Sequence, residues 1–179
     1  STNSWDFPGL SISNESEMRF GLGFIMKLSQ DGETMLFNTI LGGNDSSNII
    51  SIAVDFLGFI HVTGETRGDD FPVTANAYQN ESANPFARDA FVTKLTRDGR
   101  SLVYSTYLSG GDSDYGKGID VDNDGIIYVT GSSWSRDFPV TEGAYQTTYG
   151  GNWGDAFVAK IDPSDGKVHY VTYLGGSSD

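Results

Sequence analysis

The chain has no cysteine in its 179 residues, and it has only two histidines, His61 and His169. The lack of cysteine excludes disulfide bonds and thiolate zinc sites, although it does not assign a cellular compartment. Neither histidine recurs at the matching position of a second repeat, and neither has an Asp–Ser or Asp–Cys partner that sequence could nominate. We therefore expect that the chain is not an enzyme and has no catalytic residue.

Basic residues are also few, since 11 Lys and Arg face 24 Asp and Glu and give a net charge of −13. A nucleic-acid partner is excluded on this basis, because such binding needs Lys and Arg to displace counterions from phosphate. No run of 18 or more apolar residues occurs, so we expect no membrane insertion. An acidic surface favours solubility, and it is also compatible with binding a divalent cation.

What the chain does contain is an internal repeat with a period of 66 to 67 residues, visible in residues 24–28, 91–95 and 157–161. Each of these segments is followed by an Asp-Gly turn. A segment ending in Leu-Gly-Gly, once with an inserted serine, comes next in each copy. Two copies of an Ile-x-Val-Asp segment with its partner strand occur at residues 52–64 and 119–131. The tripeptide Asp-Phe-Pro occurs at residues 6–8, 70–72 and 137–139.

Each repeat holds four short runs rich in Val, Ile, Tyr, Phe and Thr, separated by Gly, Asp and Asn. This composition is typical of strands joined by tight turns. No segment keeps a 3.6-residue apolar period, so no long helix is expected. Four antiparallel strands per repeat indicate a propeller blade. The sequence predicts an all-β fold, a partial β-propeller of about two and a half blades.

Residues 118–131, 137–141, 143–147, 154–160 and 173–176 resemble the SBBP family of "seven-bladed β-propeller" repeats, which is found mainly in bacterial and archaeal extracellular proteins. The resemblance implies a propeller and an extracellular or cell-surface location. It brings no common activity. It also implies the blade order, with the inner strand at 52–55 or 119–122 and the outer strand around Tyr104 or Tyr170.

This order places the end of a first blade in residues 1–48, a complete second blade in 49–115 and a third blade in 116–179. Propellers usually close with four to eight blades. We therefore expect the ring to be completed by other blades of the same longer chain or by neighbouring subunits.

One acidic turn resembles the start of a calcium loop, with Asp120, Asp122 and Asp124 at alternate positions before Gly125. Alternate carboxylates are suitable ligands for calcium. The twelfth loop position holds Gly131 instead of glutamate, so a hairpin with a polar turn is the alternative. Calcium is the one cofactor that the sequence suggests.

The long connections at residues 66–88 and 132–154 are the most informative segments for function, because loops of this length are often functional. Trp134, Trp153 and Tyr149 lie in the second of them, and exposed aromatics there could stack on a sugar. The alternative is packing between blades, which the recurrence of Tyr78 as Tyr145 favours.

Three further sets of residues are interpreted as modification sites or as structural elements. Asn14, Asn44 and Asn80 begin N-glycosylation sequons, about as many as chance would produce. Asp89 and Asp155 precede equivalent strands, where a carboxylate usually accepts backbone N–H bonds. Asp-Phe-Pro is expected to be a turn anchored by a buried phenylalanine.

The first functional hypothesis is a non-catalytic extracellular module, a structural or adhesive part of a secreted or cell-surface protein or filament. Such a module would bind partners, surface proteins or glycans, through its loop face. The second hypothesis is a carbohydrate-binding or glycan-processing propeller, and burial of Trp134 and Trp153 would contradict it.

Overall fold

The computed structural model describes residues 10–12, 21–151 and 153–177, with only the backbone of 10–12. These residues form eleven strands and contain no helix. The strands make three sheets, here called blade 1, blade 2 and blade 3. Blade 1 contains β1 (Leu10–Ile12), β2 (Gly23–Leu28) and β3 (Met35–Leu41). Blade 2 contains β4 (Ser47–Val54), β5 (Ile60–Arg67), β6 (Arg88–Leu95) and β7 (Leu102–Leu108). Blade 3 contains β8 (Asp114–Val121), β9 (Ile127–Ser133), β10 (Asp155–Asp162) and β11 (Lys167–Leu174).

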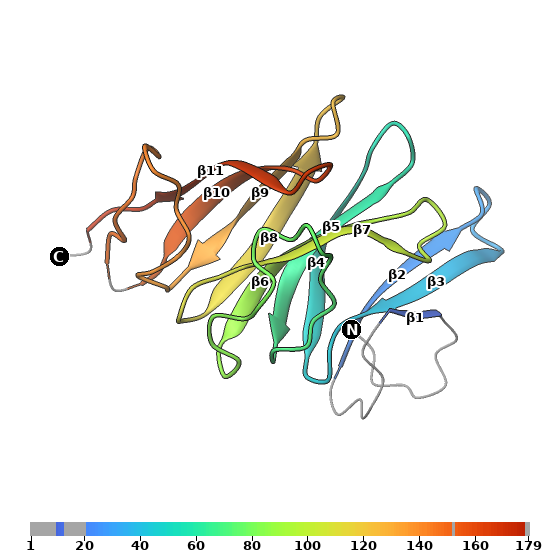
Figure 1. The fold of residues 1–179 in the computed structure, drawn as a ribbon. Helices are drawn as coiled ribbons and strands as arrows, with labels where there is room; N and C mark the ends of the chain where they lie inside the picture. Colours follow the sequence, from blue (N-terminus) through green and yellow to red (C-terminus); the bar gives the residue numbers. More distant parts are fainter. Residues whose placement is uncertain (1–9, 13–20, 152, 178–179) are drawn as a thin grey trace.

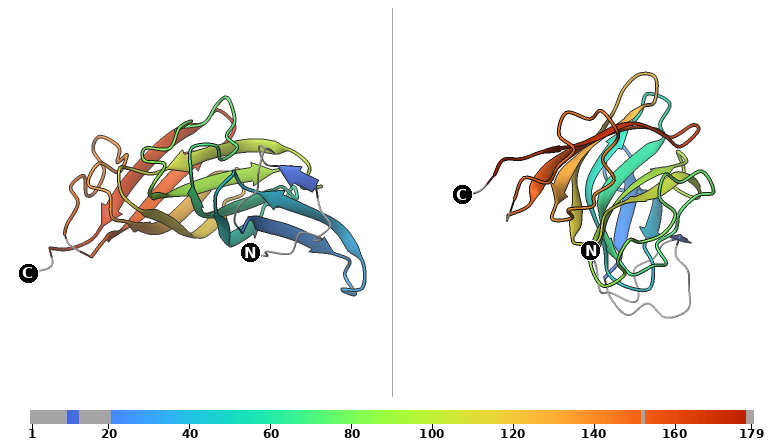
Figure 2. Two further views of the ribbon diagram at one scale, coloured as in Figure 1. Left: turned by 90° about the horizontal axis from the view of Figure 1, so that it is seen from below. Right: turned by 60° about the vertical axis from the view of Figure 1, so that its left-hand side comes forward.

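Blades 2 and 3 each have four consecutive antiparallel strands, β4-β5-β6-β7 and β8-β9-β10-β11. The three sheets follow one another in chain order across the molecule (Figure 1), and Figure 2 shows the same succession from two further sides. They do not close into a ring. The predicted all-β class and the partial propeller are confirmed. No helix that could cross a membrane occurs in the part of the chain that the structure describes.

The hairpins within the blades turn at the predicted Asp-Gly and Asn-Asp-Gly segments. Gly99 and Gly125 adopt φ angles of 68° and 81°, in the left-handed region that glycine enters without a steric penalty. The inner strands β4 and β8 begin at Ser47 and Asp114, slightly before the positions 49 and 116 where the sequence places the blade boundaries.

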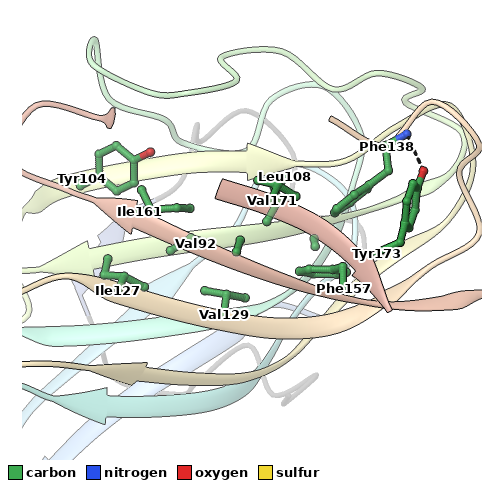
Figure 3. Close-up of a cluster of buried hydrophobic side chains, with 12 residues drawn as sticks. Val92, Tyr104, Leu108, Ile127, Val129, Phe138, Phe157, Ile161, Val171 and Tyr173 are labelled. Atoms are coloured by element: carbon green, nitrogen blue, oxygen red, sulfur yellow. Dashed lines mark hydrogen bonds between the residues drawn. The ribbon is translucent and has the colours of Figure 1, made fainter. Parts of the chain in front are cut away.

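The hydrophobic core lies between the blades, because alternate residues of a strand point to opposite faces of its sheet. One face of blade 2 packs against blade 3, and Figure 3 shows this cluster. It includes Val92 and Leu108 of blade 2 with Val129 and Phe157 of blade 3. The other face of blade 2 packs against Ile25 and other residues of blade 1. Each blade therefore needs a neighbour on both faces.

Strand β8 contacts β4, β5 and β6 of the preceding blade. A Cβ at Gly116 would overlap the hydroxyl of Thr63, so only glycine permits this close approach of the two sheets.

Blade 1 contains one strand that the sequence did not predict. Strand β1 pairs in parallel with β3, on the outer side of the sheet. In the complete blades, the long connection takes the place of β1 beside the outer strand, without forming a regular strand. In blade 2 the backbone N–H of Thr74 donates to the Ser105 carbonyl, and that of Tyr107 donates to the Gln79 carbonyl. The long connection therefore satisfies backbone groups at the free edge of the outer strand.

Candidate functional site

The Asp-Phe-Pro motif joins each blade to the one before it. The Asp70 carboxylate accepts the backbone N–H of Asn44, with its two oxygens at 2.8 and 3.0 Å from the nitrogen. Asp137 Oδ1 accepts the N–H of Gly111 at 2.8 Å. In both cases the donor follows the outer strand of the preceding blade. The motif is therefore a connection between blades as well as a turn.

The phenylalanine of the motif anchors it within its own blade. Phe71 and Phe138 are buried, as predicted. The N–H of Phe71 donates to the Tyr107 hydroxyl at 2.9 Å, and that of Phe138 donates to the Tyr173 hydroxyl at 3.2 Å. The third copy, residues 6–8, lies outside the described residues.

The two equivalent aspartates that precede β6 and β10 have different surroundings. Asp155 Oδ2 accepts the backbone N–H of Gly150 at 2.6 Å, as predicted. For Asp89 the prediction is wrong, since no N–H reaches either oxygen of this fully buried carboxylate. Burial raises the pKa of Asp89, and the nearby hydroxyls of Ser82 and Ser109 offset part of this rise.

The inserted serine accounts for a second difference, the side-chain amide that donates to Asp155 and not to Asp89. In blade 3, Gln146 donates from Nε2 to Asp155, whereas in blade 2 the matching Gln79 donates to Ser109. The serine thus takes the amide group that would otherwise reach Asp89.

Asp114, the first residue of β8, is a second fully buried carboxylate. Its Oδ2 accepts the N–H of Gly110 at 2.7 Å and the hydroxyl of Ser135 at 2.8 Å. Burial raises the pKa of Asp114 to about 7, and the charge of Asp89 adds to this rise. The two acids are thus electrostatically coupled in the packed region between blades 2 and 3.

The acidic turn predicted as a calcium loop is built around one carboxylate. Asp122 Oδ1 accepts the N–H groups of Asp124 and Ile126, both at 3.0 Å, and Oδ2 accepts the Tyr128 hydroxyl at 3.0 Å. Asp120 and Asp124 have exposed side chains. No group of three or more His, Cys, Asp and Glu side chains gathers as a metal site in the described segments. Calcium at this turn stays a prediction.

The same carboxylate recurs in blade 2 as Asp55, which sequence comparison alone did not single out. Asp55 Oδ1 accepts the N–H of Phe59 at 2.9 Å, and Oδ2 lies 3.1 Å from Nε2 of His61. Lys94 Nζ lies 3.6 Å from Oδ2. His61 is fully buried, and this burial lowers its pKa. His61 therefore belongs to the packing of the hairpin, while His169 is exposed on β11.

The candidate sugar-binding aromatics fall into two groups. Trp134 and Trp153 are 38% and 84% exposed. Tyr149 instead packs against the buried cluster, edge-on to Tyr173 with ring centroids 5.9 Å apart, and its hydroxyl accepts the N–H of Gly154. Tyr149 is therefore engaged in packing, whereas the two tryptophans are exposed.

Tyr78 and Tyr145 occupy equivalent positions with different surroundings. The Tyr78 hydroxyl donates to the Pro139 carbonyl of blade 3 at 3.3 Å, a contact between blades. Tyr145 is 88% exposed. The first of these contacts agrees with the packing interpretation of this position.

Of the three sequons, Asn44 and Asn80 have exposed side chains, and Asn14 lies outside the described residues. Sequence reasoning missed Tyr115, whose ring meets Trp134 edge-on with centroids 5.4 Å apart. Lys117 Nζ lies over the same Tyr115 ring, 4.6 Å from its centroid. No regular pattern in the sequence identifies this pair, because the register of β8 against β9 shifts between Gly116 and Gly118 and strand alternation is interrupted at Lys117.

Comparison with known families finds two matches to the model of SBBP, described as a beta-propeller repeat, at residues 37–72 and 103–139. Each match runs from the outer strand of one blade through the first two strands of the next and ends at Asp-Phe-Pro. No curated protein matches the chain. The matches cover the strands and the motif that join consecutive blades, and the chain contains two SBBP beta-propeller repeats.

Proposed function

We propose that this propeller is a non-catalytic extracellular module, a structural or adhesive part of a secreted or cell-surface protein or filament. Its binding surface would be the loop face, defined here as the links between blades (residues 42–46 and 109–113) and the long connections (residues 68–87 and 134–154). Further blades of the same longer chain or neighbouring subunits would complete the ring. Calcium at Asp120, Asp122 and Asp124 remains part of this proposal.

The observation that carries the proposal is a contrast between two kinds of residue. Those that recur in each repeat contribute to packing or to links between blades, whereas certain aromatics that do not recur are exposed. Recurring residues such as Asp70, Asp137 and Phe138 are occupied in joining or filling the blades. Non-recurring aromatics, Trp134 and Trp153, stand exposed on the loop face. Exposed aromatic side chains that the repeat does not require are typical of binding surfaces.

A second candidate, a carbohydrate-binding propeller, is favoured by the exposure of the same two tryptophans, since their burial would have contradicted it. Glycan processing has less support. It needs two carboxyl groups at a defined separation across a cleft. Of the acidic pairs Asp69–Asp70 and Asp112–Asp114, Asp70 accepts the N–H of Asn44 and Asp114 is buried.

The location is tested on intact cells that produce the protein. Antibodies against the chain should label unpermeabilised cells or the medium, and brief trypsin treatment of intact cells should remove the cell-bound signal. Labelling that appears only after lysis would contradict the extracellular assignment. Deletion of the three blades should reduce attachment to a surface without changing growth.

A further inference from the structure

The loop face of blade 3 carries an aromatic cluster, defined here as Tyr115, Trp134 and Trp153. Tyr115 contacts Trp134 edge-on. The Trp134 indole stands against the backbone of Gly154, where a Cβ would lie 2.8 Å from the ring. Trp153 directly precedes this glycine. The two tryptophans therefore belong to one local surface.

Blade 2 provides an internal comparison for this cluster. Tyr115 pairs with Ser132 across β8 and β9, as Asn48 pairs with Glu65 across β4 and β5. By the same repeat, Arg67 occupies the position of Trp134. Ala87 stands two residues before Asp89, as Trp153 stands two residues before Asp155.

At these positions blade 2 has a polar network. Asn48 Nδ2 donates to Glu65 Oε1 at 3.0 Å, and Arg88 Nη1 lies 2.8 Å from the same oxygen. Arg67 Nε lies 3.9 Å from Asp45 Oδ2. A blade of this family thus forms with polar and charged groups at the place where blade 3 has aromatic rings. Packing of the blade does not require the aromatic cluster.

The exposure of Trp134 is also a property of its position in the blade. Blade 2 is packed on both faces, and the Arg67 side chain at the matching position is nevertheless 47% exposed. The loop face therefore stays open at this position when a further blade is present. Tyr145 is different, because its equivalent Tyr78 contacts the next blade.

Within the cluster, Trp134 presents its ring to solvent, and Tyr115 with Lys117 supports this ring from the side. Lys117 covers a face of the Tyr115 ring, and the edge contact of Tyr115 holds Trp134 in place. The N–H of Trp134 donates to the Ser113 carbonyl, and the N–H of Ser113 donates to Asp112 Oδ1. Through these two hydrogen bonds, the exposed carboxylate of Asp112 lies near the backbone of Trp134.

We propose that the aromatic cluster binds a neutral oligosaccharide, with pyranose rings stacked on Trp134 and Trp153 and a sugar hydroxyl donating to Asp112. This inference rests on the proposed function, in which the loop face binds partners. Aromatic rings offer an apolar face to the C–H groups of a sugar, and a nearby carboxylate is a strong acceptor for its hydroxyls. A net charge of −13 disfavours anionic glycans and nucleic acids.

The test is calorimetric titration of the full chain with neutral oligosaccharides, namely manno-, xylo-, cello- and chito-oligomers. Acidic oligosaccharides and a proline-rich peptide, the other usual ligand of exposed aromatics, are titrated in parallel. We expect binding to at least one neutral series. The double variant W134R/W153A, which gives blade 3 the residues of blade 2, should weaken that binding about tenfold or more.

The variant Phe56→Ala is the matched control, because Phe56 is a 72% exposed aromatic in the β4–β5 hairpin, outside the loop face. It should leave the affinity unchanged, and thermal unfolding should confirm that all variants are folded. Binding only to acidic sugars or to the peptide, or full affinity in W134R/W153A, would overturn the inference. If none of these ligands binds while the protein still attaches to its surface, the inference fails and the proposed function stands. Loss of surface attachment in W134R/W153A without any sugar binding would also overturn the inference.

Discussion

Asp137 accepts a hydrogen bond from the backbone N–H of Gly111 at 2.8 Å, and this contact ties the start of one Asp-Phe-Pro motif to the end of the preceding blade. Asp70 makes the same contact with Asn44. The repeat therefore encodes the link between blades as well as the blade itself.

Replacing Asp137 by alanine should weaken the link between blades 2 and 3. The charged hydrogen bond is lost, and because Asp137 is exposed we expect a decrease of about 1 kcal/mol in the free energy of unfolding. Urea denaturation measures the change. Asp124→Ala removes an equally exposed carboxylate that makes no comparable link, and it should have almost no effect. Equal losses in the two variants would contradict the role of Asp137.

The glycine before this link should not tolerate a side chain. A Cβ at Gly110 would lie 2.5 Å from Cβ of Ser135 and 2.7 Å from Oδ1 of Asp137. Gly110→Ala should therefore destabilise the protein by about 1–3 kcal/mol through overpacking. At Gly176 a Cβ meets no atom within 4 Å, so Gly176→Ala is the control and should be nearly neutral. Thermal unfolding of both variants tests this difference.

These two predictions concern residues whose importance is visible in the sequence. Asp-Phe-Pro and Gly-Gly recur at fixed spacing, and the strands between them follow from composition and turn residues. The aromatic cluster was only half predictable. Trp134 and Trp153 stood out because they do not recur, but the support from Tyr115 depends on strand register and on a contact across the sheet.

The buried acids show a second limit of sequence reasoning. Asp89 and Asp155 both precede the segment Ala-Phe-Val, yet only Asp155 accepts a backbone N–H. The N–H that Asp155 accepts belongs to Gly150 of the long connection, and Asp155 also accepts the side-chain amide of Gln146. In blade 2 the matching amide of Gln79 donates to the inserted Ser109 instead. Such a redirection depends on three segments meeting in space, and no single segment encodes it.

The hairpin aspartates offer a prediction that compares the two complete blades. Asp55→Ala removes the partner of the fully buried His61 and of Lys94, and it should cost about 3 kcal/mol. Asp122→Ala removes hydrogen bonds from a partly exposed turn and should cost about 1 kcal/mol. Chemical denaturation of both variants measures the difference. A larger loss in Asp122→Ala would contradict this assignment of their environments.

Asp114 should make stability depend on pH in the direction opposite to most carboxylates. Burial raises its pKa from the usual 3.8 to about 7, so between these values the folded state binds more protons than the unfolded state. The contribution of Asp114 is fully present below about pH 4 and is lost as pH rises through 7. Asp89, whose pKa burial also raises, acts in the same direction. His61 acts in the opposite direction: its pKa lies below the usual 6.5, and its contribution is lost as pH falls below that value.

The variant Asp114→Asn isolates this effect, since it removes the titrating proton and keeps a group of similar shape. At pH 8 it should be more stable than the native protein by about 2–4 kcal/mol, and at pH 4 this advantage should disappear. Urea denaturation at a series of pH values from 4 to 8 measures both. Asp112→Asn, at a neighbouring exposed position, should run parallel to the native protein throughout. If the two variants showed the same pH profile, the buried charge of Asp114 could not be the cause, and the packed region between blades 2 and 3 would have to tolerate an ionised carboxylate at neutral pH.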